Sequence, residues 1–223
     1  MYVSLNTRHF DDARPIPQQH PSNKVHLHRV PAGKHLFHEG QDASSVYEVV
    51  SGVLRLTRLM EDGRRQVIAF GYPGDIVGFP SDGHYHTDCD ALSPTEGICH
   101  NRRALENGGA DQALHASLLQ AALHEISAMH DHFLMLGRKS AGEKVASFLC
   151  TLLDRVGEPL GQFTQFDLPM SRSDIADFLG LTTETVCRTL TQLRKSNIIA
   201  LDRIYTVVVL KPDGLAALAS GDA

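Results

Sequence analysis

The sequence lacks long apolar runs and is poor in cysteine, and each shortage excludes a class of protein. The largely apolar stretches among its 223 residues are short, such as residues 205–210, whereas a membrane-spanning helix needs about 20 apolar residues. Residues 1–23 carry charges, prolines and histidines where a signal peptide needs an apolar core. We therefore expect a cytoplasmic protein with no membrane partner.

The four cysteines, Cys89, Cys99, Cys150 and Cys187, are widely spread and form no CxxC pair. This spacing predicts neither a zinc cluster nor a disulfide framework. The sequence also offers no nucleophile elbow, phosphate-binding loop or paired carboxylates with an evident partner, so we expect no catalytic residues and no enzyme.

Positive charge is scarce overall but locally concentrated. The formal net charge of −5 argues, by itself, against a nucleic-acid partner. Residues 186–211, however, contain five basic residues and one acidic residue, Asp202; the basic ones are Arg188, Arg194, Lys195, Arg203 and Lys211. Such a local excess is the pattern that contact with DNA phosphates requires.

The residue composition and the hydrophobic pattern change several times along the chain. Residues 1–24 combine prolines with polar residues and predict a flexible N-terminus. Residues 25–110 contain short β-rich runs, at 46–50, 52–59 and 65–70, with glycine-containing turns between them. Several short strands at this spacing predict a small barrel, roll or sandwich.

Residues 111–137 predict one long helix, because residues 113–136 contain no proline or glycine. Apolar residues recur there at alternating spacings of three and four, and we call this set the seam: Leu119, Ala122, Ile126, Met129, Phe133 and Leu136. Such a seam fits a helix buried on its own domain as well as a two-stranded dimer interface. Its position between a β-rich domain and a DNA-reading domain favours the dimer, since a dimer presents two half-site readers.

Residues 138–223 predict a winged helix-turn-helix domain. An amphipathic helix at 141–156 is followed by a short strand at 163–168, two helices, and a strand–turn–strand at 198–210. Ser171 and Asp174 form a capping-box pattern, Gly180 supplies a turn residue, and Thr182 can cap the next helix. This is the spacing of a helix-turn-helix.

The second of these helices separates into two faces. Val186, Leu190 and Leu193 share one face and are expected to point into the domain, which leaves Glu184, Cys187 and Arg188 on the outward face. We expect these three to read bases: an arginine can donate two hydrogen bonds to guanine, and a carboxylate can accept from an amino group of cytosine or adenine. The expected phosphate contacts are Ser171, Thr182, Thr183, Thr185 and Lys195. The alternative is that Glu184 and Arg188 form an ion pair on a solvated surface.

The motif at 179–190, LGLTTETVCRTL, resembles the recognition motif of the CRP/FNR family of bacterial regulators. Residues 33–40 and 70–79 resemble turns of the family's cyclic-nucleotide-binding-type β-roll, and the resemblance covers residues 25–218. It implies an α+β fold with an N-terminal β-roll, a dimerisation helix and a C-terminal winged helix-turn-helix. It also implies a homodimer that binds double-stranded DNA at a palindrome of TTGAT-type half-sites and contacts RNA polymerase, with Glu184 and Arg188 as base readers.

The sequence departs from the family pattern at two ligand sites. Gly78 is followed by Phe79, and residues 80–91 contain no lysine or arginine to neutralise a cyclic phosphate, so we expect no cyclic AMP binding. No cysteine precedes Cys89, so we expect no iron–sulfur cluster and no other cofactor. The remaining combination is similar to the FixK branch, which implies control of microaerobic genes. Cys187 replaces the serine of FNR-like members and is either a small filler or a thiol whose oxidation inhibits DNA binding.

Thirteen histidines raise the alternative of metal sensing. Seven of them fall in two stretches, one with His26, His28, His35 and His38 and one with His84, His86 and His100 beside Asp88 and Cys89. Because exposed polar histidines are common, we expect no metal site. Two competing functions remain: a sensor whose small-molecule or metal effector binds the β-roll, and a stand-alone sensor whose helix-turn-helix docks a protein.

Overall fold

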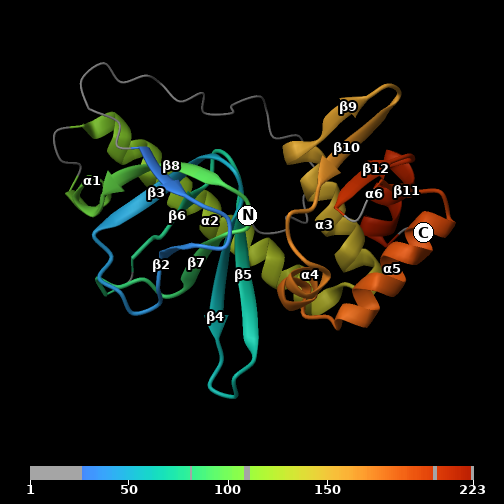
Figure 1. Ribbon diagram of the computed structural model, residues 1–223, viewed down its shortest axis with the longest axis horizontal. Helices are drawn as coiled ribbons and strands as arrows, with labels where there is room; N and C mark the ends of the chain where they lie inside the picture. Colours follow the sequence, from blue (N-terminus) through green and yellow to red (C-terminus); the bar gives the residue numbers. More distant parts are fainter. Residues whose placement is uncertain (1–26, 81, 108–110, 203–204, 222–223) are drawn as a thin grey trace. The chain divides into compact units, whose positions relative to one another are not determined.

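The computed structural model describes residues 27–80, 82–107, 111–202 and 205–221 (Figure 1). The chain divides into two compact units, one extending to Ser127 and the other beginning at Ala128. The expected flexible N-terminus at 1–24, His26 and Arg203 lie outside the described residues.

The first unit is built from eight strands in two four-stranded antiparallel sheets (Figure 1). One sheet has the order β1-β8-β3-β6 and the other β2-β7-β4-β5. The pairs β1–β8, β2–β7, β3–β6 and β4–β5 are nested, as in a long hairpin that is rolled up so that successive pairs alternate between two sheets. The strands are β1 (Leu27–Val30), β2 (His35–Phe37), β3 (Ser45–Ser51), β4 (Leu54–Leu59), β5 (Arg65–Gly71), β6 (Ile76–Val77), β7 (Asp88–Ala91) and β8 (Thr95–Asn101).

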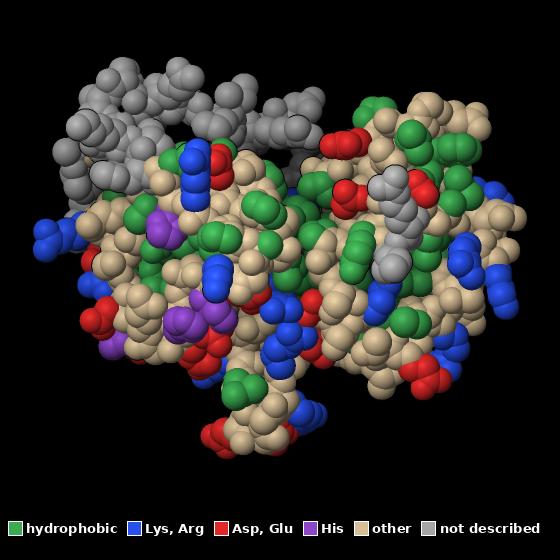
Figure 2. Space-filling view, viewed as in Figure 1, with side chains coloured by type: hydrophobic (Ala, Val, Ile, Leu, Met, Phe, Trp, Pro, Cys, Tyr) green, Lys and Arg blue, Asp and Glu red, His purple; other side chains and the backbone are tan. Residues whose placement is uncertain are grey.

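Apolar side chains from both sheets fill the space between them. Phe37, Val46 and Leu54 are almost completely buried, as are Phe70 and Cys89. Figure 2 shows that the outer surface of this unit carries charged side chains and a group of histidines. The division between apolar interior and polar exterior follows the period-two alternation of the strands.

One glycine turn of the first unit is required by sterics. Gly52, between β3 and β4, has φ +84°, and a Cβ atom built there would collide with the carbonyl oxygen of Pro94. Only glycine combines the left-handed backbone with this close approach. The turn at Gly52 thus holds the start of β4 against the segment before β8.

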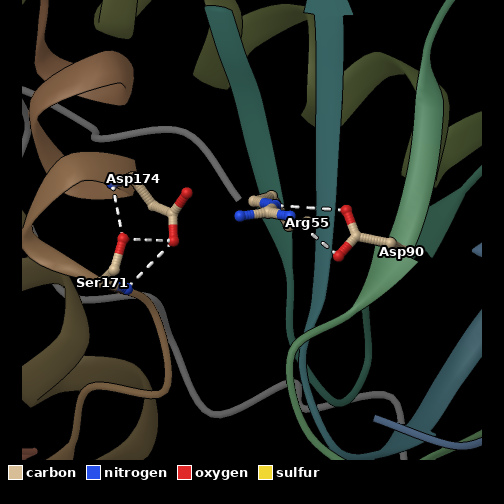
Figure 3. A network of polar contacts seen from close by, with 4 residues as sticks. All are labelled: Arg55, Asp90, Ser171 and Asp174. Atoms are coloured by element: carbon tan, nitrogen blue, oxygen red, sulfur yellow. Dashed lines mark hydrogen bonds and ion pairs between the residues drawn. The ribbon is translucent and has the colours of Figure 1, made fainter. Parts of the chain in front are cut away.

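A partly buried ion pair joins two strands of the sheet β2-β7-β4-β5 (Figure 3). Arg55 on β4 donates from Nε to Oδ1 of Asp90 at 3.1 Å and from Nη2 to Oδ2 at 3.0 Å. Asp90 is opposite Arg55 in the β4–β7 register, and its side chain is 9% exposed. These two hydrogen bonds offset the desolvation penalty of the Asp90 carboxylate.

Two helices follow the strands: α1 (Arg102–Asn107), which the sequence analysis did not predict, and α2 (Gln112–Arg138), close to the helix predicted at 111–137. Leu118 and Met135 of α2 are fully buried, and His132 is 7% exposed. Within the described residues no helix is both long and apolar enough to cross a membrane.

The second unit contains four more helices and one four-stranded sheet (Figure 1). The helices are α3 (Ala141–Val156), α4 (Arg172–Leu179), α5 (Thr183–Lys195) and α6 (Pro212–Ser220). The sheet has the order β11-β12-β10-β9, with β9 (Glu158–Leu160), β10 (Phe163–Asp167), β11 (Ile199–Asp202) and β12 (Thr206–Val209). Apart from β9 and α6, this is the predicted order of helix, strand, two helices and hairpin.

The second unit has a core shared by its helices. Phe148 and Leu152 of α3 and Phe178 of α4 are fully buried, and Phe148 lies 5.7 Å from Phe178 between ring centroids. Lys139 links α3 to α6, since its Nζ donates to Ser147 Oγ at 2.7 Å and to the Ala219 carbonyl at 2.6 Å. This framework supports α4 and α5, which carry the predicted site.

Candidate DNA-recognition site

The first helix of the pair, α4, begins with the predicted capping box (Figure 3). The Asp174 backbone N–H donates to Ser171 Oγ at 3.1 Å, and the Ser171 backbone N–H donates to Asp174 Oδ2 at 3.0 Å. The Ser171 hydroxyl donates to the same carboxylate oxygen at 2.7 Å. The exchange satisfies two amides at the helix start and fixes where α4 begins.

The turn between α4 and α5 depends on Gly180. Its φ of 62° and ψ of 41° are left-handed, and its N–H donates to the Ala176 carbonyl. The Leu181 N–H donates to that carbonyl as well, at 3.0 Å. A left-handed residue here redirects the chain within one residue, so α5 crosses α4 at a defined place.

The second helix, α5, begins at the predicted Thr182 cap. Thr182 Oγ1 accepts from the Thr185 backbone N–H at 3.1 Å and lies 2.9 Å from the Thr185 hydroxyl. Glu184 lies in the first turn, and Arg194 and Lys195 lie in the last turn. Both placements complement the helix dipole, so the two ends of α5 are electrostatically favourable.

The two faces of α5 are sorted as the sequence predicts. Val186, Leu190 and Leu193 are at most 3% exposed. The three predicted base readers, Glu184, Cys187 and Arg188, are all exposed. The helix is therefore held by its apolar face, while Glu184 stands in solvent one helical turn before Cys187 and Arg188, which are exposed as well.

The predicted phosphate contacts differ in availability. Thr183 and Lys195 are exposed, and Thr182 is exposed as well although its hydroxyl caps α5. Thr185 is half-buried against Thr182, and the Ser171 hydroxyl is engaged with Asp174. Thr183 and Lys195 are therefore the residues of this set whose side chains are most available to a phosphate.

Arg172, which follows Ser171 in the chain, was not singled out by the sequence analysis. It lies in the first turn of α4 and is half-buried, and burial lowers its pKa, whereas its proximity to Cys187 acts in the opposite direction. A cation at a helix N-terminus opposes the helix dipole, which is the sequence signal that could have singled it out. Arg172 of α4 therefore lies near Cys187 on the outward face of α5.

His132 of α2 packs against α4. The His132 ring on α2 stacks on Phe178 with centroids 4.3 Å apart and an interplanar angle of 24°. Burial lowers the pKa of His132 to about 4, and a hydrogen bond with the Phe178 backbone acts in the opposite direction. The imidazole is therefore neutral at physiological pH and packs as an aromatic core residue.

The seam residues of α2 are open to solvent within this chain. Phe133 is 79% exposed, Ile126 is 50% exposed and Met129 is 46% exposed. Leu119 is 44% exposed, whereas Ala122 and Leu136 are half-buried. An apolar row of this length on one helix is a surface that favours a partner.

The four thiols have different environments. Cys89 is buried in the first unit and Cys150 in the second, and burial raises the pKa of both, that of Cys150 to about 11. Cys99 is half-buried and Cys187 is exposed. Cys187 is therefore the most accessible of the four to an oxidant in solution.

The interior of the first unit is filled by aromatic side chains. Phe37 and Tyr85 stack with centroids 3.9 Å apart, and a Cβ atom at Gly78 would lie 3.1 Å from each ring. The cavity bounded by His28, Tyr47, Glu48 and Thr95 measures about 10 Å³. That is about the space of one water molecule, whereas ligand pockets measure about 300–1,000 Å³.

Family comparisons agree with both units. Residues 27–108 match the cyclic nucleotide-binding domain family, and residues 143–218 match the Crp-like helix-turn-helix domain family. The chain belongs to the CRP/FNR family of transcription regulators. The predicted fold, a cyclic-nucleotide-binding-type β-roll followed by a helix-turn-helix domain, is confirmed.

Individual relatives place this CRP/FNR regulator near the FixK proteins. It is 36% identical over 186 residues to the nitrogen fixation regulation protein FixK of Rhizobium meliloti, covering 83% of each chain. It is 41% identical over 187 residues to FixK of Azorhizobium caulinodans, covering 83% of this chain and 75% of that one. The structure of FixK2 from Bradyrhizobium japonicum has a TM-score of 0.79 and 34% identity, covering 88% of this chain and 98% of that one.

These relatives settle the broad class. The protein is a DNA-binding transcription regulator rather than an enzyme. The capped, outward-facing α5 lies within the matched helix-turn-helix domain.

Proposed function

We propose that this regulator is a homodimeric activator of microaerobic or anaerobic genes that reads a palindrome of TTGAT-type half-sites. The observation that carries the proposal is the exposed triad Glu184, Cys187 and Arg188 on a helix whose other face is buried. Relatives named FixK and a Rhodopseudomonas palustris protein named transcriptional activatory protein AadR, 40% identical over 188 residues, support the regulatory role. RNA polymerase is the partner through which such an activator would act.

Base reading is assigned to three side chains of α5. Arg188 donates two hydrogen bonds to a guanine, Glu184 accepts from an amino group, and Cys187 contacts a thymine methyl or the sugar. Thr183 and Lys195 contact phosphates and set the position of the helix. In this assignment, specificity belongs to α5 and general affinity to its two ends.

Footprinting and titration on a TTGAT-type palindrome test the assignment. Arg188→Ala should cost about 1–3 kcal/mol of binding and relax the preference at one base pair of each half-site. Lys195→Ala is the contrasting variant, because loss of a phosphate contact should weaken binding to all sequences and flatten the salt dependence. Equal binding of every sequence by the unaltered protein would refute the proposal.

The dimer is assigned to the seam of α2, with a second copy of this chain as its occupant. The exposed apolar residues and the spacing of three and four support a two-stranded pairing. Phe133→Glu should produce monomers in analytical ultracentrifugation and abolish binding to the palindrome, whereas Ser127→Glu, exposed on the same helix, should leave the dimer intact. A monomeric unaltered protein would overturn this assignment.

We also propose that oxidation of the Cys187 thiol inhibits DNA binding. A thiolate attacks hydrogen peroxide, giving cysteine sulfenic acid and hydroxide; a second peroxide gives the sulfinate. The added bulk and charge would face the DNA phosphates. Exposure of Cys187 and the nearby positive charge of Arg172 support this chemistry.

Peroxide treatment before a DNA-binding measurement tests this inhibition by oxidation. We expect a loss of affinity in the unaltered protein, protection by Cys187→Ser, and recovery with dithiothreitol at the sulfenic stage. Cys99→Ser is the matched control, because it removes the half-buried thiol of the β-roll and should leave the peroxide response unchanged. Equal losses in the unaltered protein and Cys187→Ser would show that the thiol is only a filler.

An effector bound to the β-roll is the competing function. The interior cavity of about 10 Å³ is too small for one, so such an effector would use the open hollow of about 630 Å³ lined by Asp42, His84 and Arg102. Calorimetric titration with cyclic AMP should give no saturable heat. Micromolar binding would restore the small-molecule sensor as the explanation.

A further inference from the structure

Two histidines and one aspartate meet on the outside of the β-roll. His35 lies in β2, His38 follows β2, and Asp88 begins β7. Candidate ligand atoms of the three side chains all lie within 4.8 Å of one another. Histidine side chains gather beside acidic ones on this unit in Figure 2.

An irregular strand register produces this cluster. His35 is opposite Asp90 while Phe37 is opposite Cys89, so two steps along β2 match one step along β7. In a regular strand His35 and Phe37 would share a face, yet Phe37 is buried and His35 is exposed. The irregularity therefore turns His35 outward without removing Phe37 from the core.

The carboxylate of Asp88 is held in place for a ligand. Its Oδ1 accepts from the Glu39 backbone N–H at 3.0 Å and lies 3.2 Å from His38 Nδ1. The His35 and His38 rings are 4.3 Å apart between centroids. Backbone support of a ligating carboxylate is typical of sites that orient their metal ligands.

Neighbouring carboxylates are paired with arginines. Glu39 lies 3.2 Å from Arg58 Nε, and Asp90 forms its two hydrogen bonds with Arg55. Asp88, in contrast, faces the two imidazoles. One carboxylate and two imidazole nitrogens thus remain as candidate ligands within 4.8 Å of one another.

We propose that His35, His38 and Asp88 form a binding site for a first-row divalent cation of the zinc type. Two imidazole nitrogens and one carboxylate oxygen are a ligand set that Zn²⁺ accepts, with water as the fourth ligand. Bonds of about 2.0–2.1 Å place tetrahedral ligand atoms about 3.3 Å apart, so modest side-chain rotation completes the site. The cation would tie β2 to β7.

Neither histidine-rich stretch predicted this set, which draws two ligands from the first stretch and one from the second. The proposal departs from the sequence analysis, which expected no metal site. The proposal is independent of DNA recognition, because none of its residues lies in the helix-turn-helix domain.

Titration of the full-length protein with Zn²⁺ tests the site. The background is Cys99→Ser/Cys187→Ser, which removes the thiols that are not buried. We expect one saturable ion per chain and a higher melting temperature with zinc than without it. The double variant His35→Ala/His38→Ala should bind zinc at least tenfold more weakly and lose the zinc-dependent rise in melting temperature. Asp88→Asn keeps an acceptor for the Glu39 amide and should weaken zinc binding as well.

His84→Ala is the matched control. His84 Nε2 lies 3.3 Å from Asp42 Oδ1, so this variant removes an exposed histidine–aspartate pair of similar geometry from the same unit. It should leave zinc affinity unchanged. Unchanged affinity in the His35→Ala/His38→Ala variant, or equal loss in the His84→Ala control, would overturn the site. Melting curves without zinc establish that each variant is folded.

Discussion

Replacement of His132 should change how the stability of the second unit depends on pH. The imidazole is 7% exposed and stacked on Phe178, and burial lowers its pKa from 6.5 to about 4. Folding therefore favours the neutral ring. This contribution to stability is fully present above pH 6.5 and is lost as the pH falls toward 4.

The size of the effect follows from the two pKa values. Between pH 7.5 and pH 5.0 the histidine should remove about 2 kcal/mol from the free energy of unfolding, with a limit of about 3.4 kcal/mol below pH 4. His132→Phe keeps an aromatic ring against Phe178 and cannot be protonated. Its own pH dependence should therefore be shallower by about 2 kcal/mol over the same interval.

Urea unfolding of both proteins at pH 7.5 and 5.0, followed by circular dichroism, measures this difference. Comparison of the two proteins cancels the carboxylates that titrate in both. His130→Gln, an exposed histidine on the same helix, is the control and should retain the unaltered protein's pH dependence. Parallel loss of stability in the unaltered protein and His132→Phe, or an NMR titration of His132 near pH 6.5, would refute the reasoning.

Three further substitutions probe the framework by urea unfolding. Ser171→Ala should lower stability by about 1 kcal/mol through loss of the cap, and the control Ser173→Ala, exposed on the same helix, should cost less. Gly180→Ala should lower the free energy of unfolding by about 1 kcal/mol, because alanine is strained in the left-handed backbone conformation. There is room for the added Cβ atom, whose nearest neighbour would be Leu136 at 3.8 Å. Arg55→Met should lower the free energy of unfolding by about 3 kcal/mol, because it leaves the buried Asp90 carboxylate without its arginine. If the double variant Arg55→Met/Asp90→Leu loses as much stability, the unpaired charge of Asp90 is not the cause of the loss.

Local sequence rules were sufficient for the helix-turn-helix. The box of Ser171 and Asp174, the left-handed Gly180 and the cap at Thr182 involve residues at most three positions apart. The faces of α5 follow from the helical period alone, since each apolar side chain repeats every three or four residues. This part of the site needed no knowledge of distant contacts.

Long-range pairing limits the rest of the prediction. The cluster of His35, His38 and Asp88 depends on a register irregularity between strands some fifty residues apart. The position of Arg172 beside Cys187 depends on how α4 crosses α5. Helix α6 carries a local signal, Pro212 in its first turn, which was overlooked.

The long helix α2 shows why periodicity alone left two interpretations open. Besides the seam, it carries Leu118, His132 and Met135, and these three side chains are buried. The chain's own packing therefore uses these three side chains, whereas Ile126 and Phe133 of the seam stand exposed, as do Leu123 and Leu134 outside it. A helix with apolar side chains on both sides can pack on its own domain and still offer a face to another copy. Burial, which the sequence period does not report, shows which apolar side chains of α2 remain exposed, and the row of them in the seam is the surface on which a second copy is expected.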